Sequence, residues 1–246
     1  MRRRTHLSLT ATAALLASAP LLALAQSTCT SDGQPQPRAV YERFINADCA
    51  ACWASAPNHA PAASDIVVDW IVPGSLGDDA PLAAAATRDS LDRLQALQRP
   101  APPASTDAFV SAVSPATPTP PGRLRVARGP VVNDYAGTGI SLWRIGGAAP
   151  PAAYRFTLLL VERIPAGTEG TPVVRHLVRN SLMGEWTAQD AQRAAARPAP
   201  LFMENRPMRV PDNAQPERLT VVGWLQDATG DVVAAAQAPC RAAAAP

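Results

Sequence analysis

The clearest chemistry in the sequence belongs to two cysteines three positions apart, Cys49 and Cys52. Two intervening residues bring the second sulfur within disulfide reach of the first. A thiolate at Cys49 can attack the disulfide of another molecule, and Cys52 can then resolve the mixed disulfide. The spacing therefore predicts thiol–disulfide exchange, with the thiols and disulfides of exported proteins as partners.

The flanking residues place this pair between a strand and a helix. Residues 39–45 alternate apolar and polar side chains, which predicts a half-buried strand. Residues 49–56 are mostly helix-tolerant, and Pro57 bends or ends that helix. At a helix start, free backbone N–H groups and the helix dipole favour a thiolate at the first cysteine.

Two carboxylates are candidates to modulate the pair. Asp48 is adjacent to Cys49, and a nearby negative charge raises the pKa of a thiol. Ala50 and Ala51 offer no cation, so the sequence predicts a less acidic thiol and a less oxidising disulfide than in strong oxidants. Asp69, in a second strand predicted over 66–72, is either a proton acceptor near the pair or a carboxylate that caps a turn.

Other functions stay open for the same cysteines. The disulfide can be structural and fix a loop in a non-catalytic periplasmic binding or assembly module. Alternatively, the reduced pair binds copper or zinc together with His59. Zinc is usually bound by four ligands, and His176, a further candidate ligand, is distant in sequence. Motifs of metalloproteases, serine hydrolases and dinucleotide-binding proteins are absent from the sequence, so we expect no cofactor and no metal centre.

The N-terminus is typical of a secretory signal peptide over residues 1–25. Arg2–Arg4 precede an apolar run over 11–24, and Ala23–Ala25 form a small-x-small cleavage site. The apolar run is shorter than the roughly 20 residues that span a bilayer. We therefore expect a secreted or periplasmic bacterial protein that begins near Gln26 and has no membrane insertion after signal removal.

Four cysteines in an oxidising compartment indicate two disulfides. Cys49 and Cys52 are neighbours, while Cys29 and Cys240 lie near the two ends of the mature chain. We therefore expect Cys49–Cys52 together with a structural disulfide Cys29–Cys240. The alternative leaves Cys29 unpaired in a mobile tail.

The number and type of charged residues exclude some classes of chemistry and of binding partner. The 22 basic residues are all arginine, which excludes Schiff-base lysine chemistry and a P-loop lysine, and they face 20 acidic residues. Three of the arginines belong to the expected signal, so the mature chain is near neutral. We expect no nucleic-acid partner, because a protein surface that binds nucleic acid needs concentrated positive charge. Arg175, His176 and Arg179 alternate along a later predicted strand and are expected to form a solvated face.

A strand that delivers C-x-x-C to a helix, with a proline five residues after the second cysteine, resembles the thioredoxin superfamily. A narrower resemblance is to a secreted bacterial thioredoxin-like family described as a domain of unknown function. It rests on the strand before Cys49, on segments 67–70, 178–180 and 184–186, and on the closing hairpin.

This resemblance singles out two further residues. The family usually has proline after the second cysteine, where this chain has Trp53. Thioredoxin-like folds place a cis-proline opposite the disulfide, just before a strand, and Pro130 is the candidate.

The sequence as a whole predicts two domains. The first is an α/β thioredoxin-like domain over 26–122, whose proline-rich tail or linker covers about 99–122. The second, over 123–241, is an all-β, immunoglobulin-like antiparallel sandwich, because about seven short strands separated by turns follow the linker.

Overall fold

The computed structural model describes residues 29–56, 61–62, 64–114, 122–143, 153–194 and 200–240. The expected signal peptide over 1–25 lies outside the described residues, as do Pro57 and His59. Within the described ranges, the strands form two sheets, and three short α-helices accompany them. No helix in these ranges is long and apolar enough to cross a membrane.

The smaller sheet is antiparallel and has the strand order β1 (Cys29–Thr30), β5 (Arg123–Val132), β6 (Tyr135–Trp143), β9 (Phe202–Arg209). The larger sheet is mixed and has the order β11 (Val232–Ala238), β10 (Leu219–Gln226), β7 (Ala153–Ile164), β8 (Arg175–Thr187), β3 (Ile66–Val72), β2 (Ala39–Asn46), β4 (Thr106–Ala112). Its parallel pairs are β2–β3 and β3–β8. The α-helices are α1 (Ala50–Ala54), α2 (Arg88–Ala96) and α3 (Ala188–Ala194).

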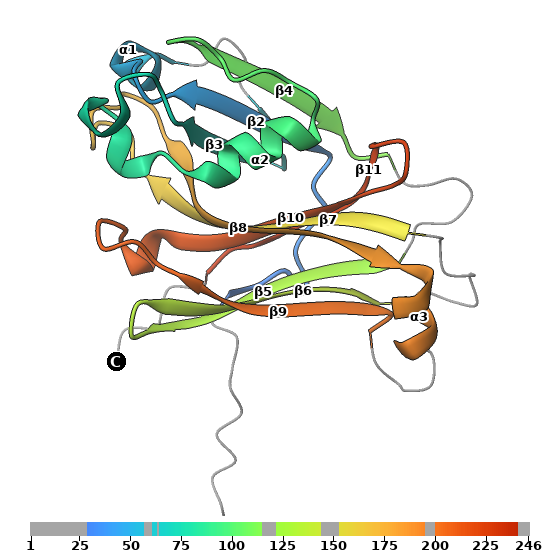
Figure 1. Ribbon diagram of the computed structural model, residues 1–246. Coiled ribbons are helices and arrows are strands. Elements are labelled where there is room, and N and C mark those ends of the chain that lie inside the picture. The colour runs from blue at the N-terminus through green and yellow to red at the C-terminus, as the bar shows by residue number, and fades with distance from the viewer. Residues whose placement is uncertain are drawn as a thin grey trace, which may run out of the picture.

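The seven-stranded sheet curls into a half-barrel, with one part against the smaller sheet and the other rising above it beside α2 (Figure 1). Strand β7 shows why two cores result. Its Leu158 and Leu160 face the smaller sheet, whereas Leu159 and Val161 face the inside of the curl. A strand buried on both faces needs a continuous apolar run, which these residues supply.

Helix α2 fills the open side of the curl with one apolar and one charged side chain. Leu94 joins the core of the curl. Arg93 donates to both oxygens of Glu42 at 2.8 and 2.6 Å, and its guanidinium lies 5.2 Å from the ring of Trp224. Because both charged groups are buried, each supplies the partner that the other needs away from water.

The expected α/β thioredoxin-like domain followed by an immunoglobulin-like sandwich is wrong. The fold is mostly β and is not an α/β thioredoxin fold. The parallel β2–β3 pair continues sideways into β8 through the pairing of Asp69 with Leu177, so strands before and after residue 122 share one sheet. Helix α1 has only five residues, and strands rather than helices complete the layers. The expected abundance of strands is confirmed.

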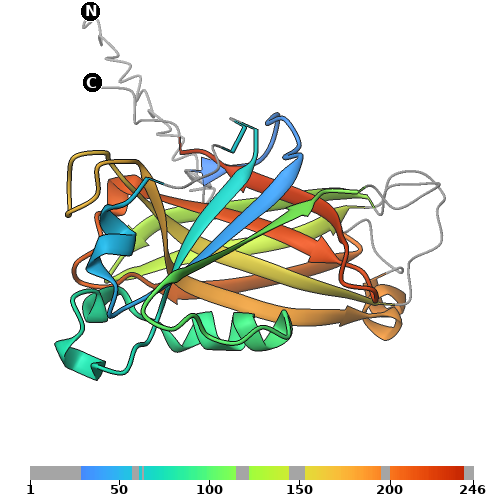
Figure 2. The same ribbon diagram turned by 90° about the horizontal axis from the view of Figure 1, so that it is seen from above.

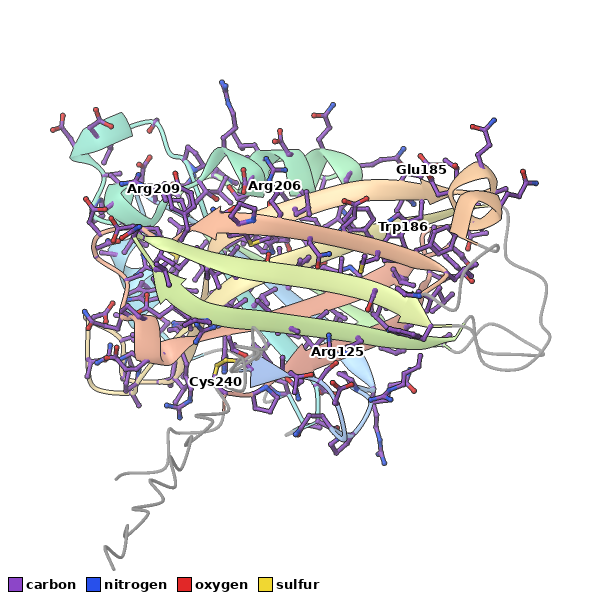
Figure 3. The ribbon with its side chains drawn as sticks, turned by 90° about the horizontal axis from the view of Figure 1, so that it is seen from below. Arg125, Glu185, Trp186, Arg206, Arg209 and Cys240 are labelled. Atoms are coloured by element: carbon purple, nitrogen blue, oxygen red, sulfur yellow. A yellow bond between two sulfur atoms is a disulfide. The ribbon has the colours of Figure 1, made fainter. Side chains whose placement is uncertain are left out.

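The disulfide Cys29–Cys240 joins the two sheets. Cys29 lies on β1 of the smaller sheet, and Cys240 follows β11, the edge strand of the larger one (Figure 3). Cys29 is 1% exposed. The structure thus confirms the expected pairing, which closes a sequence separation of 211 residues.

Replacing both of these cysteines tests how much the bond stabilises the fold. On the chain-entropy model, a loop of 211 residues makes the bond worth about 5 kcal/mol. The double variant Cys29→Ser/Cys240→Ser is therefore expected to lower the free energy of unfolding by several kcal/mol in guanidinium titrations. A loss below about 1 kcal/mol would show that the contacts between the sheets hold β1 without the bond.

Candidate functional site

The second disulfide, Cys49–Cys52, lies just beyond the end of β2. Asn46 ends the strand and shapes the turn: its side-chain oxygen accepts the N–H of Asp48 at 2.9 Å, and its amide donates to Pro102 O at 2.8 Å. Cys49 then occupies the residue before α1, where its sulfur accepts the N–H of Cys52 at 3.2 Å. The strand, the turn, the helix start and the disulfide agree with the sequence prediction.

The two sulfurs differ in their surroundings. Both cysteines are half-buried, and Ala50 and Ala51 between them are exposed. Within the described residues, Cys52 packs against the apolar cluster that contains Ile45, and Cys49 does not. Cys49 is therefore the outer residue of the pair, and Figure 2 shows α1 at one end of the molecule, beside the strand ends.

Asp48 connects the disulfide turn to the loop after β3. Its carboxylate accepts the backbone N–H and the hydroxyl of Ser75, both at 2.8 Å, and the N–H of Leu76 at 3.3 Å. Desolvation acts to raise the pKa of Asp48, but these hydrogen bonds lower it below its usual value. Asp48 thus positions a loop, and its charge is held toward Ser75.

Trp53 fixes the buried face of α1. Its side chain is buried, and its indole N–H donates to the carbonyl of Glu169 at 2.7 Å. The contact joins α1 to the loop between β7 and β8, 116 residues further along the chain. Trp53 is therefore a packing residue of the site.

Arg175 on β8 is the residue of the site that sequence reasoning missed. It is 1% exposed, and its Nη2 donates to the carbonyls of Cys52 at 3.2 Å, Trp53 at 2.5 Å and Ser55 at 2.5 Å. These are carbonyls at the end of α1, where a helix leaves acceptors unpaired and favours a cation. Ala50 and Ala51 offer no cation, but Arg175 from a distant strand brings one to the carbonyl of Cys52.

Asp69 holds Arg175 and a second arginine beneath α1. Asp69 is fully buried, and it accepts from Arg43 Nε at 2.5 Å and from the backbone N–H of His176 at 2.7 Å. Its Oδ1 also lies 3.8 Å from Arg175 Nη1. Asp69 reaches the cysteines only through Arg175, so it acts here as a structural carboxylate.

The expected solvated face of Arg175, His176 and Arg179 is wrong. Arg179 is 6% exposed and pairs with the buried Glu162 through Nε at 2.7 Å. Burial lowers the pKa of His176, with Asp69 acting in the opposite direction. Buried carboxylates on the neighbouring strands pair with these arginines inside the protein. The periodicity of the β8 sequence alone does not reveal such partners.

The remaining candidates lie apart from the cysteines or outside the described ranges. Pro130 lies on β5 of the smaller sheet, whereas the pair follows β2 of the larger one. His59 is outside the described residues. Among the described residues, no three His, Cys, Asp or Glu side chains gather as metal ligands.

Comparisons with family models, curated proteins and solved structures find no match to this chain. The resemblance to a thioredoxin-like secreted family therefore stays a prediction.

Gly74 tests the role of Asp48. A Cβ at this position would lie 2.1 Å from Asp48 Oδ1, so Gly74→Ala forces the carboxylate away from Ser75 and Leu76. We expect a loss of about 1–3 kcal/mol in unfolding free energy. Gly137→Ala on β6 is the matched control, because its added Cβ meets no atom within 4 Å. Equal stabilities of the two variants would contradict this role of Asp48.

Proposed function

We propose that the protein carries out thiol–disulfide exchange through Cys49 and Cys52. The observation that carries the proposal is the position of the pair at the start of α1. Cys49 and Cys52 are both half-buried, two exposed alanines lie between them, and Cys49 is the outer residue of the pair. In the other disulfide Cys240 is also half-buried, but its partner Cys29 is only 1% exposed. A disulfide must be reachable by an attacking thiolate to exchange.

The exchange needs only the two sulfurs and a client. The Cys49 thiolate attacks a client disulfide, forms a Cys49–client bond and releases the other client sulfur as a thiolate. Cys52 loses its proton and attacks the Cys49 sulfur, which closes Cys49–Cys52 and releases the second client thiolate. Two electrons pass from the protein to the client, and the reverse sequence passes two electrons from a client dithiol to the protein.

The surroundings of α1 support repeated exchange at a fixed position. Asp48 holds the start of the turn, and Trp53 and Arg175 hold the end of the helix. None of these contacts uses the S–S bond itself, so they can keep the two sulfurs close in both redox states. Positioned groups raise the rate of a reaction by removing the search for the correct geometry.

We also propose a secreted or periplasmic location. Two disulfides in one chain are weakly consistent with an oxidising compartment, since reducing compartments keep most thiols reduced. Clients would then be the thiols and disulfides of other exported proteins.

Trapping tests the proposed function. Cys52→Ser lacks the thiol with which the protein itself releases a client from Cys49, so mixed disulfides are expected to accumulate. Cys52→Ser is produced in the bacterial periplasm, acid-quenched, alkylated and separated on non-reducing gels. Adducts at Cys49 are identified by mass spectrometry.

Cys49→Ser is the matched control, because it leaves one thiol in the same turn, on the residue packed against the apolar cluster. We expect at least tenfold fewer adducts from it. Absence of adducts from Cys52→Ser would contradict exchange and favour a structural disulfide in a non-catalytic module.

A further inference from the structure

Positive charge beneath the Cys49–Cys52 turn exceeds negative charge. Arg43, Asp69 and Arg175 form one buried cluster, with exposures of 4%, 0% and 1%. Two guanidiniums therefore share one carboxylate: Arg43 bonds Asp69 directly, and Arg175 lies 3.8 Å from it. Guanidiniums stay protonated in proteins, so this cluster carries one unbalanced positive charge.

The hydrogen bonds of the cluster show the same imbalance. Within the described residues, the buried Nη1 of Arg43 has no hydrogen-bond partner. Burial, and then the neighbouring Arg43 cation, lower the pKa of Arg175, while Asp69 and Tyr41 act in the opposite direction. A buried charge without a full complement of partners is costly, which makes an additional negative charge nearby favourable.

The Cys49–Cys52 turn is where such a charge arises. Arg175 Nη2 lies 3.2 Å from the carbonyl oxygen of Cys52, so the excess charge directly adjoins the residue that bears the inner sulfur. The disulfide is neutral, whereas reduction frees two sulfurs that can each carry a negative charge as a thiolate. The cluster is therefore better compensated in the reduced protein than in the oxidised one.

The other charged groups around the cluster do not cancel this effect. Asp48 carries the nearest opposing charge in the turn, and its carboxylate is hydrogen-bonded to Ser75 and Leu76. His176 is neutral near pH 7, because burial lowers its pKa. Arg163, which acts on His176, adds a further positive charge.

We infer that the unbalanced Arg43–Asp69–Arg175 cluster makes Cys49–Cys52 an electron acceptor, so that the protein oxidises client dithiols to disulfides. The inference rests on the proposed function and gives it a direction. A disulfide whose reduced form is stabilised is a stronger oxidant. The substrates are therefore exported proteins with pairs of free thiols.

The reaction balances with the client as the electron donor. A client thiolate attacks the outer Cys49 sulfur, the Cys49–Cys52 bond breaks, and Cys52, whose carbonyl Arg175 binds, leaves as a thiolate. The second client thiol loses its proton and attacks the client sulfur of the mixed disulfide, which releases the Cys49 thiolate. The client loses two electrons, one proton remains on the reduced pair and one enters solvent. A small-molecule disulfide such as glutathione disulfide reoxidises the pair.

A charge series tests the inference. Arg43→Met removes the excess charge without touching the α1 carbonyls, and Asp69→Asn increases the excess by one. Each full-length variant is equilibrated with mixtures of reduced and oxidised glutathione, acid-quenched and alkylated, and the Cys49 and Cys52 thiols are counted by mass spectrometry. Arg206→Gln, an exposed arginine on β9 of the smaller sheet (Figure 3), is the control for loss of one charge.

We expect Arg43→Met to shift the equilibrium constant at least tenfold toward the disulfide, which corresponds to about 30 mV. Asp69→Asn should shift it in the opposite direction, and Arg206→Gln should change it less than twofold. In the wild type, Cys49–Cys52 should be reduced in mixtures that leave Cys29–Cys240 intact. An unchanged constant in a folded Arg43→Met protein would overturn the inference.

A measurement on the wild type keeps the test valid if a variant does not fold. Thiolate absorbance during a pH titration of the reduced protein gives the pKa of the reactive thiol. We expect a value well below the usual value of about 8.5, and a value at or above it would overturn the inference. Trapped adducts without a charge dependence contradict the inference alone. A charge dependence without adducts contradicts the proposed function alone.

Discussion

The buried guanidinium of Arg175 is the interaction on which the candidate site depends. It binds two carbonyls of α1 and that of Ser55, which follows α1. Asp69 on β3 and Thr171 in the loop between β7 and β8 contact it as well. A helix of five residues has too few internal hydrogen bonds to be stable alone, so tertiary contacts must define its position. Arg175 provides the polar part of these contacts and Trp53 the apolar part.

The site is built from segments that are far apart in sequence because one sheet brings them together. Strand β2 delivers the cysteines, β3 delivers Asp69, and β8 delivers Arg175 more than a hundred residues later. Asp69 pairs with Arg43 on β2 and with Leu177 on β8, and Arg175 is the first residue of β8. Arg175 therefore lies close to Asp69, and its side chain reaches the carbonyls of α1. The site is therefore shared between the two halves of the chain and does not belong to a separate thioredoxin-like domain.

Local features of the site could be predicted from the sequence, and its electrostatics could not. The spacing of Cys49 and Cys52 and the alternation before them predict the turn and disulfide, because those depend on neighbouring residues. The role of Arg175 depends on the pairing of β3 with β8, which no local pattern encodes. The short α1 and the mixed larger sheet likewise result from long-range packing, so the fold class inferred from the C-x-x-C segment was wrong.

The disulfide between Cys29 and Cys240 joins residues that are 211 positions apart in the sequence. Synthesis proceeds from the N-terminus, so the partner of Cys29 is made 211 residues after Cys29 itself. Cys49 and Cys52 are available together much earlier. During biogenesis the local bond can therefore form on a partial chain, while the bond of Cys29 has to wait until β11 and Cys240 have been synthesised. Throughout this interval Cys29 is exposed to incorrect partners.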